Sequence, residues 1–253
     1  MKKKRCTAVV LAAGTGSRMK SDVAKQFMLL KGHPLVYYSL KAVEDSAIID
    51  DCIVVTGKSD VAYVQQEIVE KYAFHKVAAV ISGGKERYHS VSNALEAIRQ
   101  GALEIPNSDG FIFIHDGARP MLTEAILQDT YEAVQECHAC VTATPSKDTV
   151  KLVDEQGYAV ETPQRRRVWN VQTPQVFDAS LIMDAYAQLM QALPELEQAG
   201  VPVTDDASVV ERFTDIPVKL VQGSYENIKI TTPEDIPVAE VFLNKMHKMS
   251  EET

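Results

Sequence analysis

Residues 9–27 read VVLAAGTGSRMKSDVAKQF, an apolar strand that runs directly into a glycine-rich turn carrying several cations. Small residues at the strand end let backbone N–H groups approach an anion without a side chain in the way. Arg18, Lys20 and Lys25 supply positive charge after the turn. This stretch therefore predicts the first strand of an α/β fold, followed by a loop that holds a polyphosphate.

The two best-known phosphate loops do not match this turn. The dinucleotide fingerprint needs a third glycine where Met19 stands, and the next apolar strand ends at Gly57 without the acid that binds a ribose. A Walker A loop needs a glycine directly before its lysine, but Met19 precedes Lys20. A structural turn without a ligand is the alternative, and the three cations favour a ligand.

Composition and charge limit the class of protein. A chain of 253 residues with 45% hydrophobic content can bury a full core, and we expect one domain over residues 1–253. The net charge of -9 disfavours nucleic acid and anionic membranes as partners. We expect a cytoplasmic protein, because the sequence shows no apolar run long enough for a bilayer and no signal-peptide pattern. Its four cysteines fit a reducing compartment, and Cys137 and Cys140 receive no role.

Short apolar runs alternate with amphipathic stretches over the first 145 residues, which predicts a doubly wound, mostly parallel α/β sheet. We expect helices from Pro34 to about Asp45 and from Thr123 to about Glu136. In such sheets ligands bind outside the carboxyl ends of the strands, where the glycine-rich turn lies. The predicted strands are residues 6–12, 51–56, 77–81, 110–115 and 139–144.

The alternating pattern ends after Thr144, where residues 146–172 have the alternation and turn residues of a protruding β-arm. The apolar face of an arm needs cover, and a second subunit would supply it, so we expect a homodimer. Helices are expected at 179–192 and 205–212, followed by two strands within 217–230 and a last helix from Pro233.

Asp116 and Arg119 follow directly on the fourth apolar run, at a position where α/β sheets place their ligands. Asp116 is a candidate ligand for Mg²⁺ or for a sugar hydroxyl, and the fork of Arg119 suits a phosphate. An Asp-capped turn with a surface arginine is the alternative. We expect the neighbouring His115 to be structural.

Three further segments carry candidate ligand-binding groups. Arg165–Arg167 lies on the predicted arm and offers either one arginine to a phosphate or a solvated face. Lys229 alternates with isoleucines, so its side chain points away from the core. A second glycine turn, Gly83-Gly84, enters the helix that contains Ser90 and suits contact with a base or ribose, with a plain turn as the alternative.

Six blocks spread along the chain form a jointly specific set. They are Leu11–Gly14 with Gly16, Arg18 and Met19; Lys25–Phe27; His115–Pro120; Gln172–Gln175; Thr204–Ser208; and Asn227–Lys229. With these blocks the chain resembles the 2-C-methyl-D-erythritol 4-phosphate cytidylyltransferase family of the non-mevalonate isoprenoid pathway. The ribitol-5-phosphate cytidylyltransferases are similar, but Ala13 and Ala118 depart from their usual residues. A non-catalytic nucleotide-binding module on the same fold is the alternative from another class.

The resemblance implies a Rossmann-like nucleotidyltransferase fold, CTP and methylerythritol phosphate as substrates, and Mg²⁺ as cofactor. It implies that Arg18 and Lys25 stabilise the transition state. Lys229 and Arg165 would hold the sugar phosphate, with Arg165 coming from the arm of the partner subunit and Arg166 as its substitute. The other implied assignments are Asp116, Arg119 and Thr149 for the sugar phosphate, Asp116 for the metal, and Ala12, Ala13, Gly14, Gly84 and Ser90 for cytidine.

Overall fold

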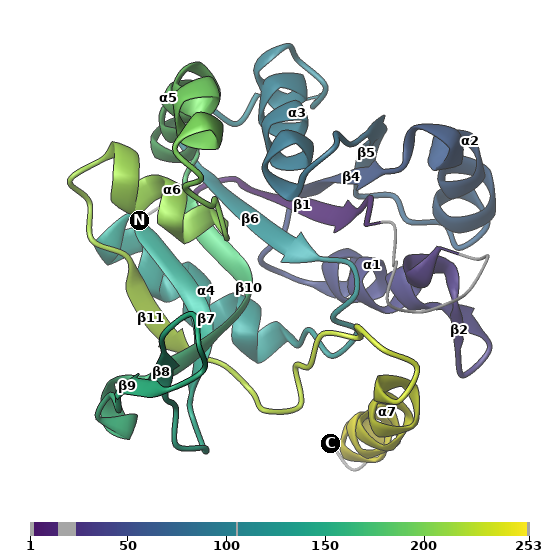
Figure 1. Cartoon of the computed structure of the whole chain (residues 1–253). Coiled ribbons are helices and arrows are strands. Elements are labelled where there is room, and N and C mark those ends of the chain that lie inside the picture. Colours follow the sequence, from purple (N-terminus) through teal and green to yellow (C-terminus); the bar gives the residue numbers. More distant parts are fainter. Residues whose placement is uncertain (1–2, 15–23, 105, 252–253) are drawn as a thin grey trace.

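A seven-stranded sheet forms the centre of the computed structural model, which describes residues 3–14, 24–104 and 106–251, with side chains as far as residue 246. The strand order is β11-β7-β10-β6-β1-β4-β5 (Figure 1), and β10 alone runs antiparallel to its two neighbours. These strands are β1 (Cys6–Ala12), β4 (Asp51–Thr56), β5 (Val77–Ser82), β6 (Phe111–Asp116), β7 (Ala139–Pro145), β10 (Trp169–Asp178) and β11 (Lys219–Gln222). The five predicted strands of the first half are confirmed.

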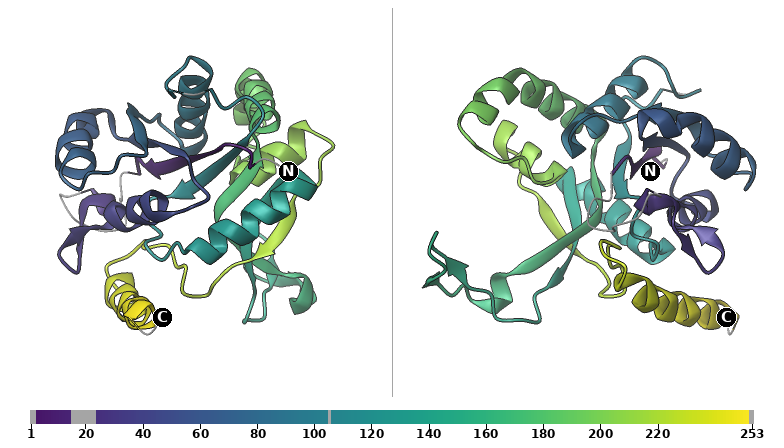
Figure 2. Two further views of the ribbon diagram at one scale, coloured as in Figure 1. Left: turned by 180° about the vertical axis from the view of Figure 1, so that it is seen from behind. Right: turned by 45° about the vertical axis from the view of Figure 1, so that its right-hand side comes forward.

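Helices cover both faces of this sheet (Figures 1 and 2). Ala8 and Val10 of β1 pack in the core under α1, η4 and α4, whereas Val9 packs in the core under α3, α5 and α6. The alternation of side chains along each strand thus feeds two cores, and the doubly wound fold is confirmed. The helices are α1 (Leu35–Asp45), α2 (Val61–Tyr63) with its π-helical continuation η4 (Val64–Glu70), α3 (Arg87–Arg99), α4 (Glu124–Cys137), α5 (Ala179–Gln198), α6 (Asp206–Phe213) and α7 (Asp235–Glu251).

Helix caps explain where two of these helices begin. The Thr123 hydroxyl accepts a hydrogen bond from the backbone N–H of Ile126 at the start of α4. Asp205 caps α6 in the same way, accepting from the N–H of Ser208 at 3.0 Å. Both starts lie where the sequence predicts them. None of the helices described here is long and apolar enough to cross a membrane.

The prediction of two strands within 217–230 is wrong in its second half. Only Lys219–Gln222 forms a strand there, paired in parallel with β7. Beyond it the chain leaves the sheet because its polar groups bond elsewhere: the buried Asn227 side chain donates to the carbonyl of Thr173, and Ile230 N–H donates to the carbonyl of Ala118. This irregular segment carries Lys229 across the carboxyl ends of the strands.

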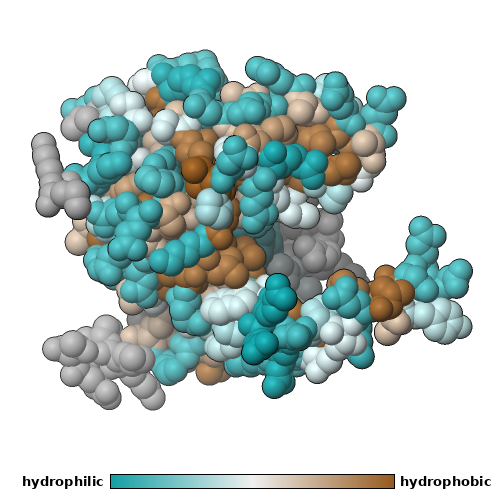
Figure 3. All heavy atoms as spheres, turned by 90° about the vertical axis from the view of Figure 1, so that its left-hand side faces the viewer, coloured by the Kyte–Doolittle hydropathy of each residue, from teal (hydrophilic) through white to brown (hydrophobic). Residues whose placement is uncertain are grey.

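An arm projects from the sheet between β7 and β10 (Figure 2). It contains the short hairpin β8 (Leu152–Val153) and β9 (Ala159–Glu161) and the 3-10 turn η5 (Arg165–Arg167). Gly157 closes the hairpin with φ +87°, a conformation that favours glycine. The arm carries exposed apolar side chains (Figure 3), which include Leu152, Val153, Tyr158 and Val160.

Candidate active site

A cavity of about 640 Å³ lies at the carboxyl ends of β1, β4, β5 and β6. The predicted cytidine residues Ala12, Ala13, Gly14, Gly84 and Ser90 all line it. Lys25 lies in the 3-10 turn η2 (Lys25–Phe27) and also lines it, as do Asp116 and Lys229. The structure therefore gathers in one place residues that the sequence separates by more than two hundred positions.

The second glycine turn forms one wall of this cavity. Gly84 N–H donates to the Ser90 hydroxyl at 3.1 Å, which holds the turn against the first helical turn of α3. A Cβ on Gly83 would lie 2.6 Å from Ser90 Oγ and 2.7 Å from Ala13 Cβ. A residue without a Cβ therefore lets the Gly83-Gly84 turn pack against Ala13 and the start of α3.

Asp116 is the acidic centre of the site. Its carboxylate lies 2.9 Å from Lys229 Nζ, 3.4 Å from Arg119 Nε and 3.7 Å from Arg87 Nε. Burial raises the pKa of this carboxyl, but the positive charges of Arg87, Lys229 and Arg119 lower it more, so that the pKa lies well below its usual range. Asp116 is thus ionised at neutral pH and holds three cations near one another.

A smaller cavity of about 350 Å³ adjoins the first at this cluster. Arg87, Asp116 and Lys229 line both cavities, and the predicted phosphate ligand Arg119 lines the smaller one. Its other walls come from β10 and the segment before α6, with Gln172, Thr173, Gln175, Thr204 and Asp205 among them. The arrangement provides two compartments that share one charged partition.

His115 supports the site from behind rather than acting in it. Asp116 N–H donates to the Thr173 hydroxyl, which lies 3.0 Å from His115 Nδ1, and His115 Nε2 lies 3.2 Å from the carbonyl of Arg119. Since a carbonyl only accepts, Nε2 carries the proton and Nδ1 accepts from Thr173. Burial lowers the pKa of His115 to about 4, so the ring is neutral and structural, as predicted.

The described residues do not form a magnesium site of their own. Among them no group of three or more His, Cys, Asp or Glu side chains is arranged to hold a metal ion. Asp116, the predicted ligand, fits that role poorly because three cations already surround its carboxylate.

Two predicted residues lie apart from both cavities. Thr149 and Arg165 are exposed on the arm, where Arg165 Nη1 donates to the carbonyl of Lys147 at 3.3 Å. Arg18 and Lys20 fall outside the described residues. Arg87 was missed, although its place in the first turn of a helix that follows a glycine turn at a strand end was a usable signal.

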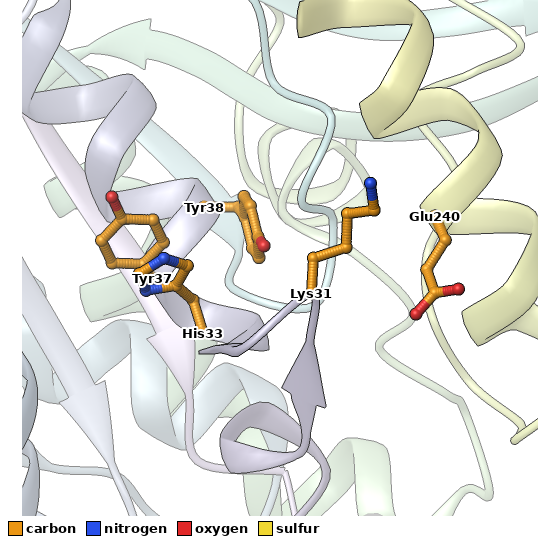
Figure 4. A pocket seen from close by; sticks show the side chains of 5 residues that line it. All are labelled: Lys31, His33, Tyr37, Tyr38 and Glu240. Carbon is orange, nitrogen blue, oxygen red and sulfur yellow. The ribbon is translucent and has the colours of Figure 1, made fainter.

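Another cavity, of about 550 Å³, lies between the β2–β3 hairpin (Leu29–Leu30 and His33–Pro34), α1 and α7 (Figure 4). Lys31, His33, Tyr37, Tyr38 and Glu240 line it. His33 stacks on Tyr37 with ring centroids 4.2 Å apart, so this wall belongs to an aromatic cluster. None of its lining residues also lines the two cavities at the strand ends, where most of the predicted substrate-binding residues lie.

The doubly wound sheet and its small-residue, cation-flanked cavity define an α/β enzyme of the nucleotidyltransferase class. Residues 6–245 match the family model of 2-C-methyl-D-erythritol 4-phosphate cytidylyltransferase. The chain belongs to this family of cytidylyltransferases.

Relatives and solved structures agree with that membership. The cytidylyltransferase of this name from Lachnospira eligens is 46% identical, over 94% of this chain and 98% of the relative. That of Lachnoclostridium phytofermentans is 45% identical, over 95% and 97% respectively. The crystal structure of 4-diphosphocytidyl-2C-methyl-D-erythritol synthase from Anaerococcus prevotii superposes with a TM-score of 0.80 at 35% identity, covering 96% of this chain and 97% of that one.

Proposed function

We propose that this protein transfers the cytidylyl group of CTP to the phosphate of 2-C-methyl-D-erythritol 4-phosphate, giving the diphosphocytidyl product and pyrophosphate. The observation that carries the proposal is the pair of adjoining cavities that share Asp116 and Lys229. One compartment offers small residues and backbone to a nucleotide, and the other offers Arg119 to a second phosphate. This is the arrangement that a reaction between two phosphorylated substrates needs.

The chemistry calls for cations rather than a general base. A phosphate monoester has a second pKa of about 6, so its attacking oxygen is largely ionised at neutral pH. The buried, neutral His115 is accordingly not used as a base. The difficulty lies in bringing two polyanions together and supporting the charge that develops on the α-phosphate. Lys25 and Arg18 supply that charge, while Lys229 and Arg119 hold the sugar phosphate beside Asp116.

The protein acts as a homodimer through its arms. Leu152, Val153, Tyr158 and Val160 are 48 to 71% exposed on the isolated chain, and apolar side chains gathered on a projecting element favour cover by a second subunit. In such a dimer Arg165 and Thr149 reach the sugar-phosphate compartment of the partner. Magnesium, when bound, would be held by the oxygens of the triphosphate, which are the ligands it prefers, and would neutralise part of their charge. The four free cysteines fit the reducing cytoplasm.

Pyrophosphate release tests the reaction. The protein is incubated with CTP and Mg²⁺ and offered methylerythritol phosphate or ribitol phosphate in parallel. Release with methylerythritol phosphate alone is expected. Release only with ribitol phosphate would identify the protein as a ribitol-phosphate cytidylyltransferase instead, and release with neither substrate would favour a non-catalytic nucleotide-binding module.

Sedimentation of the wild type and of a Leu152→Ser, Val160→Ser variant tests the dimer, which should dissociate in the variant.

A further inference from the structure

Arg87 stands between the two compartments and is held from behind. It is the first residue of α3, its side chain is 28% exposed, and it lines both cavities. Its Nη1 and Nη2 donate to the two carboxylate oxygens of Asp206 at 2.7 and 2.6 Å, which is the two-pronged geometry of a strong charge-assisted pair. Only the Nε edge of the fork remains for the site, where it lies 3.7 Å from Asp116 Oδ1.

Asp206 is itself held by the elements packed around it. The residue is fully buried at the start of α6, and the Tyr186 hydroxyl of α5 donates to its Oδ1 at 2.6 Å. The next residue, Ala207, donates its N–H to Gln175 Oε1 of β10 at 2.9 Å. Two side chains, from α3 and α5, thus converge on one carboxylate that lines neither cavity, and the Gln175 bond ties the start of its helix to β10.

Such an arrangement is poorly explained by stability alone. A buried ion pair loses much of its attraction to the cost of removing both charges from water, and apolar residues of similar volume often stabilise a fold as well. A fixed cation beside a reacting centre has a different value, because it needs no reorganisation when charge develops. The charge of Arg87 is also the largest of the three charge effects that lower the pKa of Asp116.

We propose that Asp206 and Tyr186 are positioning residues of the cytidylyl transfer: they lock Arg87 between the compartments, so that it orients the Asp116 carboxylate and, through it, Lys229 and Arg119 toward the sugar phosphate. This inference rests on the proposed function. Without the clamp, the Arg87 fork is free to turn from Asp206 to Asp116. It would then compete with Lys229 for the carboxylate and disturb the sugar-phosphate compartment more than the nucleotide compartment.

Steady-state kinetics on Tyr186→Phe and Asp206→Asn test the clamp, with both substrates varied. Loss of one hydrogen bond to a charged group predicts a fall of about tenfold in kcat/KM for the sugar phosphate in Tyr186→Phe, and a larger fall in Asp206→Asn. The KM for CTP should change less than about twofold. Thr130→Val is the matched control, since it deletes a buried hydroxyl on α4 under the opposite face of the sheet and should leave the kinetics unchanged.

A double-mutant cycle separates positioning from general structural damage. If Tyr186 acts through Arg87 and Asp116, the effect of Tyr186→Phe should vanish in an Asp116→Asn background, whereas structural damage would persist there. An undiminished effect in that background, or a folded Tyr186→Phe enzyme with unchanged kcat/KM for the sugar phosphate, would overturn the clamp while the proposed function stands. A wild type active only on ribitol phosphate would refute the function, and the same cycle on that substrate would still decide the clamp.

Discussion

Acidification should destabilise this protein through the buried, neutral ring of His115. The ring is buried and neutral, and its pKa falls from 6.5 to about 4 because burial disfavours the charged form. Asp116 raises this pKa, as does the hydrogen bond to the Arg119 carbonyl, whereas the charges of Arg119 and Lys229 lower it. Between these two pH values the unfolded chain binds a proton that the folded chain does not, so stability rises with pH in that window.

The size of the effect follows from the shift. A pKa that falls from 6.5 to about 4 corresponds to about 3 kcal/mol of stability, of which roughly 2.5 kcal/mol is lost on going from pH 7.5 to about pH 4.5. That loss is a large part of the 5–15 kcal/mol that ordinarily separates folded from unfolded protein. Protonation would also turn Nδ1 into a donor, so that the Thr173 hydroxyl would have to turn its own proton elsewhere and accept from Nδ1 instead of donating to it.

Urea unfolding at several pH values between about 7.5 and 4.5 measures this loss, with His115→Gln as the comparison. Glutamine keeps a donor for the Arg119 carbonyl but has no group that titrates. The wild type should lose roughly 2.5 kcal/mol over the range, and the variant should lose most of this dependence while being less stable at neutral pH. Parallel curves for the two proteins would refute the assignment of the acid sensitivity to His115.

Three further predictions concern the site. Lys25→Ala should lower kcat by roughly 10²-fold, the usual cost of removing a preorganised charge from an oxyanion, and near wild-type pyrophosphate release would contradict its role. Arg165→Ala should mainly raise KM for the sugar phosphate, and an effect confined to CTP would contradict the assignment of substrates to the two compartments. Gly83→Ala places a Cβ 2.6 Å from Ser90 Oγ, so it should cost about 1–3 kcal/mol in unfolding free energy and raise KM for CTP; a stable variant with unchanged KM would show that the turn gives way easily.

The sequence predicted those features of the fold that local patterns determine. The apolar runs of β1, β4, β6 and β7 are buried from both faces of the sheet, and such strands are continuous and apolar. Caps at Thr123 and Asp205 gave two helix starts. The segment after β11 misled the prediction because the alternation around Lys229 has another cause: Ile228 and Ile230 contact the small core under α7, and no strand is needed to place them there.

The part of the candidate site that lies in glycine turns and at strand ends could be predicted, because such segments have local signatures. The pairing behind it has none. Arg87 follows a glycine turn and Asp206 lies in the Thr204–Ser208 block, but the two are 119 positions apart and neither segment indicates that they meet. Tyr186 is one aromatic residue on a helix whose apolar stripe predicts nothing but burial. Arg87, Asp206 and Tyr186 meet only because the fold packs α3, α5 and α6 on the same face of the sheet.

The carboxylate at the centre of the site explains how cations can be gathered before a substrate arrives. Arg87, Arg119 and Lys229 would repel one another by several kcal/mol in a partly buried site, and Asp116 offsets that repulsion. The same carboxylate repels a phosphate that enters the smaller cavity alone. Under the proposed function a sugar phosphate would reduce that repulsion, because a hydroxyl could donate to Asp116 while the phosphate meets Arg119 and Lys229. We therefore expect Asp116 to favour a polyol phosphate over inorganic phosphate at the position where the nucleophile must lie.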